Sequence, residues 1–171
     1  MSILKENISI NKKIDWIAYY QIGGGIIGAV LLVMMTLEQV QTSSLSFLYF
    51  LIPILFFSFS VFAGIHLLKR HKSSTLITQI NQVIQIPQLS LFGFSYQYFA
   101  GLFLGLGISN ELGIGFNFSL PNFKFVLTNS NDEFLFMVNL IPIILVILLK
   151  KFQRKLEQNN RIIEMLESGK R

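Results

Sequence analysis

Hydrophobic positions along this chain gather into long uncharged runs separated by polar segments. The first two runs cover residues 17–37 and 47–68, and neither contains a charged side chain. Because a helix rises ~1.5 Å per residue and the bilayer core is ~30 Å thick, each run is long enough to cross a membrane. The connector between them carries no Lys or Arg. Residues 1–72 are therefore predicted to form a short basic leader and a transmembrane helical hairpin.

The last uncharged run, residues 134–149, is shorter and has Asn139 inside it. Lys150 and Lys151 follow it directly, which is typical of a stop signal at a membrane surface. The sequence predicts a third transmembrane helix here, with Asn139 as an intramembrane polar group, and an amphipathic basic helical tail behind it. These elements make up the predicted region 132–171.

Between the hairpin and this region, residues 73–131 show two different periodicities. Apolar residues of segment 73–90 fall at helical spacing beside Gln and Asn, which predicts an amphipathic helix in the membrane interface, ending before Pro87. From residue 92 to residue 127, large apolar residues alternate with small or polar ones, which is typical of β-strands. A β-rich segment is therefore expected to pack on the membrane surface beside the hairpin.

The distribution of Lys and Arg conflicts with three crossings. Three precede the first run, none lies in the first connector, four lie between the second and the last run, and seven follow the last run. Three crossings would place equal numbers on the two sides, whereas a fourth at about residues 91–108 would leave only Lys124 outside. The alternation continues past Ile108 into a stretch that no span includes, so strands are favoured. The predicted fold class is an α-helical integral membrane protein with three spans, and four spans are the alternative.

Small residues in the first run predict a helix-packing face. Gly24 and Gly28 are four residues apart, and Gly25 with Ala29 repeats that spacing, which lets another helix approach closely. The predicted packing residues are Gln21, Gly24, Gly25, Gly28 and Ala29. Whether they pack against the second helix or another subunit is open.

Composition agrees with lipid as the main solvent of the chain. Of its 171 residues 52% are hydrophobic and 13% are charged, against about 25% charged in soluble domains. The net charge of +5 resides in short clusters at the ends of apolar runs, so it indicates topology rather than nucleic-acid binding. Residues predicted to set the topology or to bind lipid headgroups are Lys69, Arg70, Lys72, Lys150 and Lys151.

The residues that carry catalytic chemistry are sparse. The chain has no cysteine, its nine carboxylates all lie outside the apolar runs, and its two histidines have no further ligand at a matching spacing. No nucleotide-binding, hydrolase or metalloprotease motif is present. We therefore predict no catalytic, metal-binding or cofactor-binding residues and no cofactor.

The resulting hypothesis is a non-enzymatic accessory or scaffold subunit of a membrane complex. The alternatives are an oligomeric pore or transport component and a module that binds anionic lipid. The expected partners are the bilayer and other membrane subunits or further copies of this chain, without nucleic acid. The expected location is a bacterial inner membrane with the N-terminus in the cytoplasm.

Overall fold

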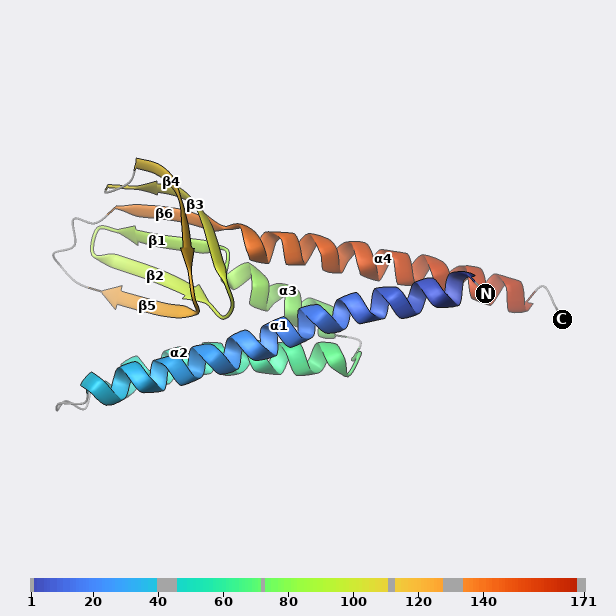
Figure 1. The fold of residues 1–171 in the computed structure, drawn as a ribbon, viewed down its shortest axis with the longest axis horizontal. Helices are drawn as coiled ribbons and strands as arrows, with labels where there is room; N and C mark the ends of the chain where they lie inside the picture. The colour runs from blue at the N-terminus through green and yellow to red at the C-terminus, as the bar shows by residue number, and fades with distance from the viewer. Residues whose placement is uncertain (1, 40–45, 72, 111–112, 128–133, 169–171) are drawn as a thin grey trace.

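The computed structural model describes residues 2–39, 46–71, 73–110, 113–127 and 134–168. In this part of the chain three helices precede a six-stranded antiparallel sheet, and a fourth helix follows it (Figure 1). The helices are α1 (Ser2–Gln39), α2 (Ser46–Leu68), α3 (Ser74–Ile84) and α4 (Leu140–Ser168). The strands are β1 (Pro87–Leu91), β2 (Phe94–Phe99), β3 (Phe103–Ser109), β4 (Gly113–Ser119), β5 (Asn122–Leu127) and β6 (Leu135–Asn139).

Helices α1 and α2 form a closely packed hairpin. A Cβ added at Gly25 would lie 2.8 Å from the carbonyl oxygen of Phe57, and one added at Gly64 would lie 2.7 Å from that of Ala18. Only residues without a side chain permit so close an approach of two helix backbones. The partner of the glycine face is therefore the second helix of the same chain.

The sheet has the strand order β4-β3-β6-β1-β2-β5, and every neighbouring pair is antiparallel. A two-residue loop joins β1 to β2 and consists of Phe92 and Gly93, both with positive φ. This is the backbone of a type I′ turn, whose twist matches the twist of paired strands. Strand β6 comes last in the sequence but lies in the middle of the sheet, between β1 and β3.

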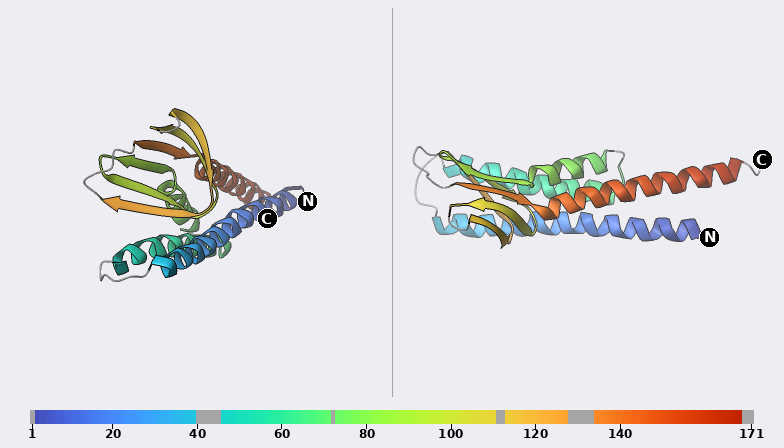
Figure 2. Two further views of the ribbon diagram at one scale, coloured as in Figure 1. Left: turned by 60° about the vertical axis from the view of Figure 1, so that its left-hand side comes forward. Right: turned by 90° about the horizontal axis from the view of Figure 1, so that it is seen from above.

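The sheet lies beside the apolar half of the hairpin, as the three views in Figures 1 and 2 show. Tyr98 of β2 is fully buried, and its hydroxyl donates a 2.7 Å hydrogen bond to the carbonyl oxygen of Phe56 in α2. Tyr96 donates a 2.9 Å bond to the carbonyl of Ile84. The sheet is thus packed along the hairpin, not on a surface beyond its end.

Helix α3 is amphipathic, as its spacing predicts, but it is oriented with the polar face inward. Thr78 and Asn81 are fully buried, and the Asn81 amide donates a 3.2 Å bond to the Ser60 hydroxyl of α2. On the opposite face, Leu76 and Val83 are more than half exposed. An amphipathic helix on a water-soluble protein shows the reverse arrangement.

Helix α4 runs back along the N-terminal half of α1. Buried Leu149 of α4 packs against Ile14, Ile17 and Ala18 of α1, and Leu145, Leu148 and Phe152 extend this cluster. The start of α1 and the end of α4 consequently lie at the same end of the molecule (Figure 1).

The predicted α-helical fold class with three spans was wrong. The structure combines four helices with a six-stranded antiparallel sheet, and among the described residues only α1 and α2 are long and apolar enough to cross a membrane. The predicted span at residues 134–149 is divided: β6 takes its first part because the strand completes the sheet between β1 and β3, and α4 begins at Leu140. The alternative fourth span at residues 91–108 is also wrong, because β2 and β3 occupy it.

Candidate functional site

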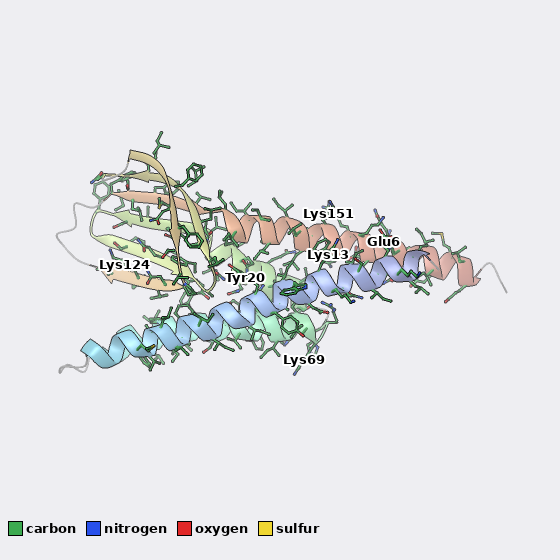
Figure 3. The ribbon with its side chains drawn as sticks, in the orientation of Figure 1. Glu6, Lys13, Tyr20, Lys69, Lys124 and Lys151 are labelled. Atoms are coloured by element: carbon green, nitrogen blue, oxygen red, sulfur yellow. The ribbon has the colours of Figure 1, made fainter. Side chains whose placement is uncertain are left out.

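A basic groove lies between α1 and α4. Its volume is about 670 Å³, and it lies at the end of the molecule opposite the sheet. The cationic lining residues are Lys13 of α1 and Lys150, Lys151, Arg154 and Lys155 of α4; Glu6 is the acidic lining residue. Figure 3 shows Lys13, Lys151 and Glu6 along this part of the two helices.

The four cations of α4 stand on neighbouring turns of one helix. Lys150 and Arg154 are four residues apart, and so are Lys151 and Lys155. Like charges at this spacing destabilise a helix by roughly 0.2–0.5 kcal/mol per pair. Lys155 contacts Glu6 at 3.4 Å, whereas the described residues provide no ion-pair partner for Lys150, Lys151 or Arg154. The groove therefore presents concentrated positive charge, of which the described residues neutralise only that of Lys155.

Apolar contacts hold the floor of the groove in place. Ile10 and Ile147 line it, and Ile10 belongs to the buried cluster that joins α1 to α4. The ring of Phe152 lies in the groove with the Lys13 ammonium 5.7 Å from its centroid, a cation–π distance. Such a site offers an apolar floor with cations on its walls, a combination that suits an amphiphilic anion.

A polar clamp closes the outer end of the groove. Asn159 of α4 is 3% exposed, and its amide nitrogen donates to the Asn7 side-chain oxygen at 2.7 Å and to the Glu6 carboxylate at 3.1 Å. These contacts fix the separation of the two helices. The sequence analysis missed Glu6, Asn7 and Asn159, because the two helices are far apart in the sequence and nothing in either one signals the other.

The predicted headgroup residues divide between two roles. Lys150 and Lys151 line the groove, and Lys69 is exposed just after the end of α2 (Figure 3). Arg70 has instead a structural position: its guanidinium donates to the Asp15 carboxylate at 2.6 Å and to the Asn11 carbonyl at 2.9 Å, which ties the end of α2 to α1. Lys72 lies outside the described residues.

The predicted packing residues lie inside the molecule. A Cβ at Gly24 would meet the Ala100 carbonyl, and one at Gly28 would meet the Phe57 ring. Gln21 is 1% exposed, and its backbone carbonyl accepts a 3.2 Å bond from Ser60. Ala29 packs against the cluster of Phe57, Tyr98 and Ala100. All of these residues, with Gly25 described above, face α2 or the sheet.

Asn139 was predicted to be an intramembrane polar residue of a span, but it ends β6 and precedes α4. Its side-chain oxygen accepts bonds from the backbone nitrogens of Ile141 and Leu104, each at 3.3 Å. The bond from Ile141 is that of a helix N-cap, since it satisfies one of the free donors in the first turn. Asn139 therefore stabilises the junction between strand and helix.

Comparison with known proteins gives no family for this chain. No family model, no curated protein and no solved structure matches it. Among the described residues no group of three or more His, Cys, Asp or Glu side chains is placed to hold a metal ion.

Proposed function

We propose that this chain is a non-enzymatic membrane protein that is anchored by the α1–α2 hairpin and binds anionic phospholipid headgroups in the groove between α1 and α4. Of the functions expected from the sequence, this is the alternative of a module that binds anionic lipid. It does not need a second subunit on the glycine face, which the chain's own α2 and sheet occupy.

One observation carries the membrane part of the proposal: α1, α2 and α3 bury several polar side chains while many of their large apolar side chains are exposed. Polar side chains buried between them include Gln21, Ser60, Thr78, Asn81 and Gln82. Exposed apolar side chains on the same helices include Ile26, Ile27, Val30, Leu55, Phe62, Leu76 and Val83. The exposed apolar side chains are unfavourable in water and favourable in hydrocarbon, and among the buried polar groups Asn81 donates to Ser60.

Charge segregation supports the proposed depth and orientation. The described Lys and Arg residues of the helices lie toward the end where α1 begins and α4 finishes, and Lys124 is the one basic residue of the described strands (Figure 3). Basic residues prefer the cytoplasmic side of a membrane. The groove would then lie at the level of cytoplasmic headgroups, with the hairpin extending from it into the bilayer.

The groove part is tested by native mass spectrometry of the detergent-solubilised protein with phosphatidylglycerol and phosphatidylcholine as probes. We expect phosphatidylglycerol to bind more tightly, and the triple variant Lys150→Gln, Lys151→Gln, Arg154→Gln to lose that preference. At ~1 kcal/mol per charge near the surface, three charges correspond to roughly 100-fold in affinity.

A matched control removes the same number of charges from the same two helices outside the groove. The variant Lys5→Gln, Lys12→Gln, Arg161→Gln keeps the groove lining intact and should retain most of the preference. If both triple variants lose it equally, the attraction is a property of net charge and the groove is not the site. Equal binding of the two lipids by the unaltered protein would reject headgroup selectivity.

A further inference from the structure

The outer face of β3, β4 and β6 is a broad exposed apolar surface. The side chains that form it alternate along the three strands: Leu104, Leu106 and Ile108 of β3, Ile114, Phe116 and Phe118 of β4, and Phe136 of β6. Phe116 is 70% exposed and Ile114 is 81% exposed. The pairing register places Leu106 between Phe116 and Val138, so these residues form one continuous surface.

The opposite face of the same sheet encloses a trough of about 220 Å³. Its polar lining residues are Gln88, Gln97, Asn117, Ser119 and Asn122, and Phe99, Phe103, Leu135 and Met137 complete it. Gln88 is 2% exposed, and its amide nitrogen has no hydrogen-bond partner in the protein. A buried amide of this kind is satisfied by water when the cavity holds several polar groups, as this trough does.

A half-exposed sheet in a water-soluble protein has its apolar face inward and its polar face toward solvent. Here that arrangement is reversed over β3, β4 and β6: the register puts their apolar side chains on the same face as Tyr96 and Tyr98, which pack against α3 and α2, and this face continues uncovered beyond the helices. Exposed apolar residues on alternate strand positions are the pattern of strands that contact lipid. The described side chains of α3 show the same reversal, and α3 leads directly into this sheet.

The apolar sheet face lies at the same depth as the proposed transmembrane hairpin. Gly24 lies against Ala100 in the β2–β3 connection, and Leu32, further along α1, lies beside Phe123 and Phe125 of β5. The sheet therefore accompanies the apolar half of α1, whereas the basic groove lies at the opposite end of the molecule (Figures 1 and 3).

We propose that the outer face of β3, β4 and β6 contacts lipid acyl chains and that the trough is a water-filled inlet within the bilayer. This inference rests on the proposed membrane insertion of the hairpin. Backbone groups at an open sheet edge are unfavourable in lipid but are tolerated where they line a water-filled cavity. The two edge strands both contribute to the trough, Asn117 and Ser119 from β4 and Asn122 from β5.

Adjacent residues of β4 provide a matched test, because Phe116 belongs to the outer face and Asn117 to the trough. In a Trp16→Phe background, which removes the one native tryptophan, tryptophan is placed singly at residues 116, 117 and 30. The variants are Phe116→Trp, Asn117→Trp and Val30→Trp, the last on the exposed face of α1. Each is reconstituted into vesicles of phosphatidylcholine with or without bromine on the acyl chains, after circular dichroism has verified its strand and helix content.

We expect brominated lipid to remove most of the emission of Val30→Trp and Phe116→Trp, and aqueous iodide to quench Asn117→Trp alone. If Val30→Trp is quenched by bromine but Phe116→Trp is not, the sheet lies outside the bilayer and this inference fails while the hairpin insertion stands. If Val30→Trp is not quenched, the proposed insertion itself fails. Should Phe116→Trp lose its fold, Phe118→Trp samples the same outer face.

Discussion

Gly24 of α1 lies directly against the backbone carbonyl of Ala100, so closely that an added Cβ would fall 1.7 Å from the carbonyl oxygen. This contact joins a helix predicted to cross the membrane to the connection between β2 and β3. No side chain fits between the two backbones, so the glycine sets how closely the sheet approaches the hairpin.

Replacing Gly24 with alanine is expected to destabilise the protein. The methyl group would collide with a backbone atom, which has little freedom to move, so we expect a loss of ~3 kcal/mol, the upper part of the range for overpacked sites. Gly23→Ala is the matched control: a Cβ there meets no atom within 4 Å, and alanine favours a helix by ~1 kcal/mol over glycine. Thermal unfolding in detergent, followed by circular dichroism, should give a lower Tm for the first variant and an unchanged or higher Tm for the second. Equal Tm values would mean that the contact does not persist in solution.

Tyr20→Phe is expected to weaken the same junction. The Tyr20 hydroxyl accepts a 2.9 Å bond from the Leu102 nitrogen and donates a 3.3 Å bond to the Leu102 carbonyl. Its removal should cost about 1 kcal/mol, or roughly 2–4 °C in Tm for a chain of this size. Tyr19, 59% exposed on the same helix turn, provides the control variant Tyr19→Phe, which should leave Tm unchanged. If both variants behave alike, Tyr20 does not attach the helix to the sheet.

Arg70 combines two opposing effects on stability. Its guanidinium binds Asp15 and Asn11, but its φ of 54° lies in the left-handed region, which costs an L-residue about 1–2 kcal/mol. Arg70→Ala should lose the contacts and keep the strain, whereas Arg70→Gly should lose the contacts and relieve the strain. We therefore expect Tm to fall in the order native, Arg70→Gly, Arg70→Ala. An Arg70→Gly protein less stable than Arg70→Ala would contradict strain at this position.

The clamp at Asn159 is expected to hold α4 against α1. Asn159→Leu leaves the Glu6 and Asn7 side chains without their shared donor. Hydrogen exchange of the α4 amides after residue 155 should accelerate, because this end of the helix would open locally. Glu164→Ala, an exposed position on the same helix, should leave the exchange unchanged. Exchange in Asn159→Leu that equals the native rate would show that apolar contacts alone hold the helix.

The sequence predicted the hairpin because its signals are local. Two uncharged runs of sufficient length, with no basic residue between them, correspond to α1 and α2. The alternation from residue 92 to 127 corresponds to β2 through β5, since alternate side chains of a strand face opposite sides. Helix α3 ends before Pro87 as expected, because a proline disfavours helical backbone in the residue before it.

The roles of several predicted site residues depend on contacts with distant parts of the chain, which signals within a few residues do not reveal. Lys150 and Lys151 were identified from their position after an apolar run, but their groove also needs Lys13 and Glu6 from the other end of the chain. Asn139 resembled an intramembrane polar residue, and only the pairing of β6 makes it a helix cap. The conflict between the distribution of Lys and Arg and three crossings has the same origin. Because α4 folds back beside α1, the described basic residues of both helices lie toward one end.

The sequence by itself determined which segments are apolar, which alternate and where the charges lie, because composition and spacing act within a few residues. Only the tertiary structure decided that the late strand β6 enters the middle of the sheet between β1 and β3, and that the sheet lies along the hairpin with the face of Tyr96 and Tyr98 against α3 and α2. Strand order and the side a sheet presents depend on contacts between residues distant in the sequence, such as Gly24 with Ala100. The alternation of apolar and polar residues along a strand is the same whichever face of the sheet packs against the helices. Tertiary packing alone therefore decides which face that is.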